Sequence, residues 1–243
     1  MAMDGGRWRQ LATVAGVSFL ANIGAAAAEQ GSIQMDVEQM KQLFGSEPGW
    51  TAVGGAAGDV LRARIAESSL ALGRITALQA RRLPFYQTFQ LYRADLATVP
   101  ASQLHALARG DEMFLLDGTA APLQAVNRLE ALRLDAATVI DYLGFFLDYA
   151  PGRGEGFRLV GMIDEVPFDG QATAEDHRKV AGLLQPLRVT GETAELFRLE
   201  GTVLFRQALF ATSFVVRRDG EVNTMGEQLL LDDVPAEARP PVW

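Results

Sequence analysis

The last third of the chain carries the pattern that most limits the possible folds. Residues 197–205 alternate between apolar and polar side chains, which predicts a strand with one buried face. Residues 208–217 are almost wholly apolar, which predicts a strand buried on both faces. The segment 218–221, Arg-Asp-Gly-Glu, has the composition of a tight hairpin turn, so residues 222–231 are predicted to return antiparallel. The chain is therefore expected to end in an antiparallel meander.

Upstream of this meander, the sequence predicts helices mixed with short strands. Helices are expected over 60–83, 102–109, 119–132, 135–149 and 173–184, and strands over 85–92, 113–116 and 156–163. Strand character near 70–80 stays open as an alternative. Helices and a few strands followed by a long antiparallel meander indicate an α+β fold. A curved sheet wrapped around one or two helices, as in the cystatin-like or NTF2-like roll, fits this order, although an architecture carries no function by itself.

The first thirty residues have the three-part layout of a secretory signal. Arg7 and Arg9 make a basic start, residues 11–28 carry no charge, and a run of four alanines closes the segment. A cut after Ala28 or Ala27 leaves small side chains at the two positions that signal peptidase reads. Two alternatives stay open: an uncleaved membrane anchor, and a helix of a cytosolic protein.

These patterns divide the chain into four parts. Residues 1–28 are interpreted as the signal peptide or membrane anchor, and the glycine-rich residues 29–58 as a flexible arm. Residues 59–235 are expected to form a single α+β domain, and residues 236–243 a proline-rich tail.

Composition excludes several classes of chemistry. The 243 residues are 49% hydrophobic and 21% charged, which is typical of a globular protein. The absence of cysteine excludes disulfides, a thiol nucleophile and cysteine-ligated metals, and two histidines, His105 and His177, are too few for a multi-histidine centre. A net charge of −8 argues against a broad nucleic-acid surface. We therefore expect no cofactor, no metal and no nucleic-acid partner.

The local motifs do not indicate a known catalytic apparatus. The glycines of 54–58 lack the spacing of a dinucleotide-binding loop and read as a flexible connector. The sequence contains neither a phosphate-binding G-K-[ST] nor a G-x-S-x-G nucleophile motif, and each histidine is expected on a helix as an ordinary structural residue. The oxygen-rich turn at 219–223 lacks the later ligands of a calcium-binding loop. No catalytic residue is therefore predicted.

The predicted helix 135–149 carries the best candidates for a binding site. It holds the densest aromatic cluster, and two acids seven residues apart share one face about 10 Å apart along the helix axis. The candidate residues are Tyr142, Phe145, Phe146, Tyr149, Asp141 and Asp148. The aromatic stripe is consistent with a core-facing side, or with an apolar pocket that has two phenol hydroxyls at its rim.

Two classes of function follow from these observations. The first is a non-catalytic, exported (periplasmic or secreted) domain that binds a protein partner or a small molecule, with an edge strand available for strand addition. The second is a small roll-fold enzyme that uses carboxylates and tyrosines as acids and bases. A cytosolic accessory protein with an N-terminal docking helix is a third possibility. The apolar run 205–216 must be covered by helices or by a second subunit, so a homodimer is a further expectation.

Overall fold

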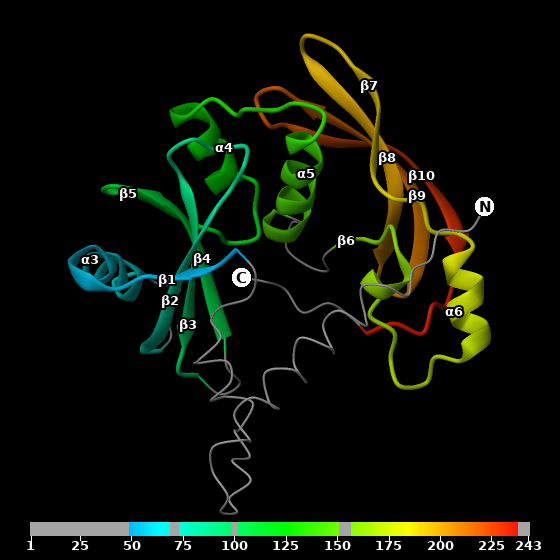
Figure 1. The fold of residues 1–243 in the computed structure, drawn as a ribbon, viewed down its shortest axis with the longest axis horizontal. Coiled ribbons are helices and arrows are strands. Elements are labelled where there is room, and N and C mark those ends of the chain that lie inside the picture. Colours follow the sequence, from blue (N-terminus) through cyan, green and yellow to red (C-terminus); the bar gives the residue numbers. More distant parts are fainter. Residues whose placement is uncertain (1–48, 69–72, 99–101, 151–156, 238–243) are drawn as a thin grey trace, which may run out of the picture. The chain divides into compact units, whose positions relative to one another are not determined.

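The computed structural model describes residues 49–68, 73–98, 102–150 and 157–237, and these residues form an α+β fold (Figure 1). This confirms the predicted class. The predicted signal or anchor at 1–28, most of the arm at 29–58 and all but the first two residues of the tail at 236–243 lie outside the described residues. Among the described residues, no helix is both long enough and apolar enough to span a membrane.

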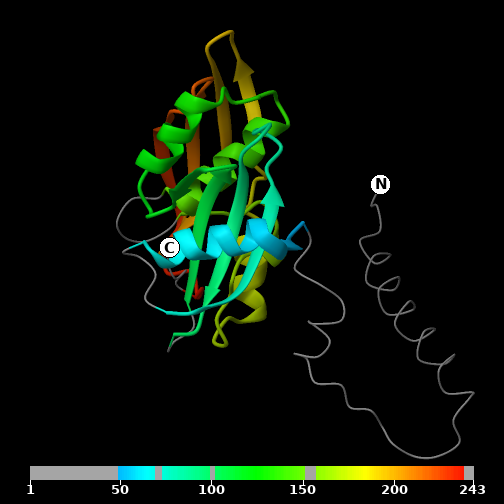
Figure 2. The same cartoon turned by 90° about the vertical axis from the view of Figure 1, so that its left-hand side faces the viewer.

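The first sheet has five antiparallel strands in sequence order. They are β1 (Thr51–Ala52), β2 (Ile75–Arg82), β3 (Gln90–Leu96), β4 (Ser102–Arg109) and β5 (Glu112–Leu115). Helix α3 (Gly55–Ala66) lies across these strands (Figure 2). Its apolar side chains Leu61 and Ile65 pack against Leu78 and Ala94 of the sheet, which gives this face its own hydrophobic core.

The second sheet is the predicted meander. Its strands are β6 (Arg158–Leu159), β7 (Arg188–Glu192), β8 (Leu196–Phe205), β9 (Ala208–Arg217) and β10 (Val222–Leu231). The order is β10-β9-β8-β6, and β7 also pairs with β8, along the first half of that strand, whereas β6 pairs near its end. Strands β9 and β10 match the predicted ranges, and the turn between them is the predicted hairpin. The three-residue 3₁₀ helix η1 (Ile163–Glu165) and helix α6 (Ala174–Ala181) precede β7, and α6 begins with the predicted capping box between Thr173 and Asp176.

A third group of elements joins the two sheets through one core. Helices α4 (Ala121–Leu129) and α5 (Thr138–Tyr149) pack into a cluster that contains buried residues of both sheets. Leu91 and Leu107 come from the first sheet, and Phe214 and Val216 come from the second. The apolar strand β9 is thus covered in part by the protein's own core. The structure therefore differs from the cystatin-like or NTF2-like roll expected from the sequence, because it has two sheets where a roll has a single curved sheet.

Strand β4 corrects the predicted helix over 102–109. Its five central residues, 104–108, are all buried. Leu104 packs in the cluster under α3, while Leu107 packs in the cluster under α5. A strand covered on both faces shows no alternation, so its apolar spacing resembled that of a helix. His105, expected on that helix as a solvated or partly buried residue, is buried on β4 and only 3% exposed.

Three predicted boundaries also shift. The glycines of 54–58, predicted to be a flexible connector, cap and begin α3, and Trp50 before them is buried in the shared core. The predicted helix 60–83 ends at Ala66, and the alternative of a strand near 70–80 holds for 75–82. The strand predicted from residue 85 begins at Gln90, because the loop before it is tied to α4 by Glu130.

Candidate ligand pocket between α5 and β6

Helix α5 begins at Thr138, three residues after Asp135, where the sequence predicts the helix to begin. The Asp135 carboxylate accepts hydrogen bonds from the backbone N–H groups of Ala137 and Thr138, at 2.9 and 2.8 Å. These bonds, with one from the Thr138 hydroxyl, hold the pKa of Asp135 below its ordinary value. They satisfy the first N–H group of the helix and that of the residue before it, and so hold the turn that leads into α5.

The aromatic stripe of α5 faces the core. Tyr142, Phe145 and Tyr149 are buried, and Phe146 is half-buried against the same cluster. Tyr142 meets Phe85 edge-to-face at 5.2 Å between ring centroids, and Phe145 lies 4.9 Å from Tyr149. These are favourable geometries for aromatic pairs in a packed interior. Four of the six predicted site residues therefore belong to the core that joins the sheets.

The Tyr142 hydroxyl is part of a buried hydrogen-bond network. It donates to the carbonyl oxygen of Gly220 at 2.7 Å and accepts from the Asn127 side-chain nitrogen at 3.0 Å. Asn127 also donates to the carbonyl of Asp219 and accepts from the Tyr86 hydroxyl at 2.6 Å. The network thus connects the loop before β3, both central helices and the β9–β10 hairpin.

Burial makes both tyrosines weaker acids. It raises the pKa of Tyr142 to about 12, and the charge of Asp219 acts in the same direction, although the bond from Asn127 partly offsets them. Burial also raises the pKa of Tyr86 well above its usual range, and Tyr142 and Glu130 add to this. Both hydroxyls therefore stay protonated near neutral pH and serve as structural hydrogen-bond groups, which does not favour the acid–base role considered for tyrosine.

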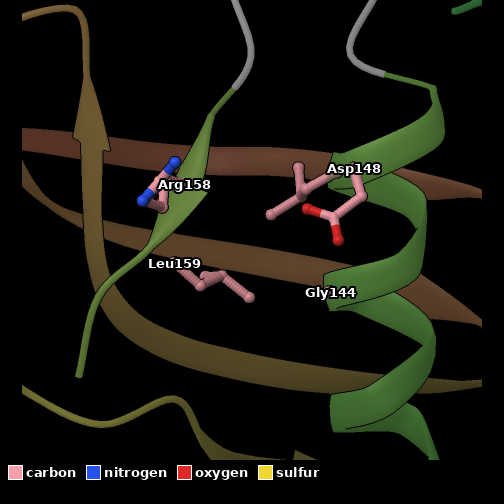
Figure 3. Close-up of a pocket in the computed structure, with 5 residues that line it drawn as sticks. Gly144, Asp148, Arg158 and Leu159 are labelled. Atoms are coloured by element: carbon pink, nitrogen blue, oxygen red, sulfur yellow. The ribbon is translucent and has the colours of Figure 1, made fainter. Parts of the chain in front are cut away.

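The two predicted acids of α5 lie in different surroundings. Asp141 is exposed near the start of the helix, while Asp148 is partly buried near its end. Asp148 lines a pocket between α5 and β6 together with Gly144, Leu147, Arg158 and Leu159. Figure 3 shows Asp148 and Leu159 in the space between the helix and the strand, with Arg158 on the strand side. The structure thus keeps one predicted acid at a pocket and leaves the other in solvent.

This α5–β6 pocket has a volume of about 430 Å³ and is open on one side. Leu147 and Leu159 add apolar surface to a lining that is more polar than apolar, and its two charged residues come from opposite elements, Asp148 from α5 and Arg158 from β6. Gly144 leaves room at the middle: a Cβ there would meet only Leu159, at 3.9 Å. A glycine inside a helix costs about 0.5–1 kcal/mol relative to alanine, and close packing does not demand one here.

The pocket residues on β6 were not predicted. Arg158 lies opposite Leu204, and Leu159 lies opposite Val203, so β6 is held by a strand that comes much later in the chain. Next to them, Phe157 stacks on Phe205 with centroids 4.7 Å apart. The sequence predicts a strand over 156–163; of its described residues, 157–163, only Arg158–Leu159 form one, and nothing in that run indicates which strand it pairs with.

A second charged cluster, around Glu130, holds the loop before β3 in place. The carboxylate accepts from the backbone of Gln87 and Thr88 and from the Thr88 hydroxyl, and Arg109 lies 3.6 Å away. Burial alone would raise the pKa of Glu130, but these bonds and one from the Phe89 N–H outweigh it and lower the pKa. With its oxygens occupied by the loop, Glu130 is a structural anchor.

Among the described residues, no group of three or more histidines and acids is placed to hold a metal ion. Comparison with protein-family models, with curated proteins and with solved structures found no match for this chain.

Proposed function

We propose that this protein is an exported, non-catalytic binding protein, and that its α5–β6 pocket takes a small zwitterionic molecule with an apolar side chain, such as a free amino acid. The observation that carries this proposal is the placement of a carboxylate and a guanidinium on opposite elements of one open, partly apolar hollow. Asp148 would accept the ligand's ammonium group, and Arg158 would donate to its carboxylate.

The dimensions support a small ligand. Pockets for small molecules usually have volumes between about 300 and 1,000 Å³, with a few polar groups that fix orientation. The α5–β6 pocket falls at the lower end of that range. Leu147 and Leu159 would contact the apolar side chain, and Gly144 leaves space for it.

Calorimetric titration of the purified protein with three related ligands tests the proposal. Leucine carries both charges, N-acetylleucine lacks the ammonium group, and leucinamide lacks the carboxylate. We expect saturable binding of leucine and at least about tenfold weaker binding of the other two, because each loses a charge-assisted hydrogen bond. Equal binding of all three would refute the charge-based recognition, and no binding of any of them would refute the ligand class.

Two pairs of variants connect the binding to the pocket. Asp148→Asn and Arg158→Gln should each weaken leucine binding at least about tenfold. Gly144→Leu should abolish it by filling the hollow, while Gly144→Ala should leave it intact, since its Cβ reaches only ordinary contact with Leu159. Thermal unfolding of each variant separates a filled pocket from a damaged fold. Leucine binding that survives Gly144→Leu would place the ligand elsewhere.

Export is supported by the basic, apolar and small-residue order of residues 1–28. The intact mass of the protein purified from its native host, recorded with its cell fraction, tests this part. Loss of residues 1–28 and an extracytoplasmic fraction would support it. A full-length mass in the membrane fraction would support the anchor instead, and a full-length mass in the cytosol would refute export.

A further inference from the structure

Strand β10 is exposed on both of its faces. Seven successive residues, 223–229, are exposed, and they include Met225 and Leu229, at 65% and 52% of their possible area. A strand at the side of a core normally buries one of its two faces. Here Phe214 is 3% exposed, yet Thr224, its partner on β10, is exposed, and Val222 at the start of β10 is the residue of that strand that packs against the shared core.

Strand β10 is also an edge strand of the second sheet. Among the described strands, β10 pairs only with β9, so its other side presents backbone N–H and C=O groups along ten residues. Proteins commonly protect such an edge with proline, lysine, bulges or inward-pointing charges. Strand β10 has two irregularities, at 224/226 and at 229/231, but no proline or basic residue, and its only charge is Glu227.

The charges around this edge are mostly acidic and favour a basic partner. Asp219 and Glu221 lie at its start, Glu227 in its middle, and Asp232 and Asp233 at its end, and all five are exposed. Arg217 partly neutralises the first two, at 4.0 and 3.7 Å. No described residue forms an ion pair with Glu227, Asp232 or Asp233.

Antiparallel pairing with a second copy of the same strand is disfavoured by these charges. It would bring the acidic start of one β10 next to the acidic end of the other, at both ends of the interface. Like charges placed opposite each other destabilise a strand pair. A strand with basic residues at both ends would instead meet an acid at each end.

Side-chain positions define the partner further. Glu227 and Leu229 lie on one face of β10, because their partners on β9, Thr212 and Phe210, are two residues apart with regular pairing between them. A strand added at this edge would place its own alternate side chains beside these two. A basic residue beside Glu227 and an apolar residue beside Leu229 would complete the match.

We propose that β10 binds an extended, basic segment of another protein by strand addition. The segment carries lysine or arginine near both ends and beside Glu227, and an apolar side chain beside Leu229. The main chain supplies the attraction along the edge, and the acids select against neutral and acidic segments.

A synthetic peptide tests this with the whole protein. The probe has about ten residues to match β10, with lysine at both ends and in the middle and alternating valine and threonine between them. We expect saturable binding by fluorescence anisotropy that weakens at least about fivefold between low and high salt. Hydrogen exchange should slow at amides of 223–229 when the peptide is bound.

Two altered peptides separate strand addition from simple charge attraction. A peptide with the same sequence but N-methylated at alternate residues cannot donate backbone hydrogen bonds along one of its two edges. Two such peptides are tested, one methylated at the odd-numbered and one at the even-numbered residues. At least one of them should bind about tenfold more weakly. A peptide with glutamate in place of lysine should not bind. The proposal would be overturned if both methylated forms bound as tightly as the unmethylated peptide. It would also be overturned if the glutamate peptide bound as tightly as the lysine peptide.

Protein variants locate the site. Glu227→Gln, and Asp232→Asn combined with Asp233→Asn, should each weaken binding about threefold or more, whereas Asp164→Asn removes an exposed acid on η1 and should have no effect. An equal loss from Asp164→Asn would indicate non-specific attraction to an acidic protein and overturn the proposal. So would a light-scattering mass showing a dimer whose β10 amides are protected without peptide.

Discussion

Replacement of Gly220 by alanine should destabilise the protein more than any other single methyl group added to the β9–β10 hairpin. Gly220 has a φ of +88°, where a side chain costs roughly 1–2 kcal/mol. Its added Cβ would lie 2.6 Å from Leu132 Cδ1 and closer still to the Asn127 side-chain nitrogen and the Tyr142 hydroxyl. Real Cβ contacts do not occur at such distances, so the turn must move away from the two helices.

The magnitude follows from what that movement breaks. Overpacking of a filled core typically costs about 1–3 kcal/mol. The Tyr142–Gly220 hydrogen bond and the Asn127–Asp219 hydrogen bond are lost or stretched, and each contributes about 1 kcal/mol. Together with the backbone strain, we expect a loss of at least about 4 kcal/mol in the free energy of unfolding, which is a large part of the usual 5–15 kcal/mol.

Two other glycines serve as matched controls for the same measurement. Gly110 has a φ of +50° but open space around its Cβ, so Gly110→Ala isolates the backbone strain at about 1 kcal/mol. Gly226 has neither a positive φ nor a close neighbour, so Gly226→Ala should change stability by less than about 0.5 kcal/mol. Urea unfolding followed by circular dichroism measures all three. A loss for Gly220→Ala within about 1 kcal/mol of that for Gly110→Ala would refute the predicted clash.

Three further predictions concern the polar anchors and one turn. Tyr142→Phe should lower the free energy of unfolding by about 2 kcal/mol, because it leaves the buried Gly220 carbonyl without its donor; a loss below about 0.5 kcal/mol would contradict the network. Glu130→Gln should cost roughly 2 kcal/mol at pH 7. Because the folded-state pKa of Glu130 is lowered, its carboxylate stabilises the fold above the unfolded value of about 4.3 and loses that effect as the pH falls through the folded value. The difference between this variant and the unaltered protein should therefore shrink in acid, and a pH-independent difference would contradict the assignment. Arg206→Gly should raise stability by about 0.5–1 kcal/mol in thermal unfolding, because Arg206 has a φ of +55° in a two-residue turn. A loss would show that the contacts of its side chain, which include the Phe205 ring, outweigh the strain.

The parts of the fold that the sequence predicted well are those determined by neighbouring residues. The turn at 218–221 depends on its composition, which includes one glycine, and the strand before it depends on a continuous apolar run. The turn and the strands on either side of it are all present. The Thr173–Asp176 capping box is likewise a local pattern. Strand β4 was missed because its apolar run reflects coverage by two different clusters, which no local pattern records.

The α5–β6 pocket shows the same division. Helical spacing placed Asp148 among the candidates, but nothing near Arg158 in the sequence indicates that it lies across from α5. That placement depends on pairing between β6 and β8, so it is a property of the folded chain. The interior glycine of α5, Gly144, was available as a signal, because a helix loses stability to keep a glycine where alanine fits.

The aromatic stripe of α5 shows why a core and a pocket rim have the same sequence signature. Both need large side chains on one helical face, and a tyrosine hydroxyl suits a solvent-facing rim as well as a buried partner. What decides between them is whether the fold supplies a partner for the hydroxyl. Here the partner is the carbonyl of Gly220, 78 residues away, and only a residue without a side chain leaves room for Tyr142 to reach it. The stripe and the turn were each visible in the sequence, but the hydrogen bond between them exists only because the second sheet packs against α5.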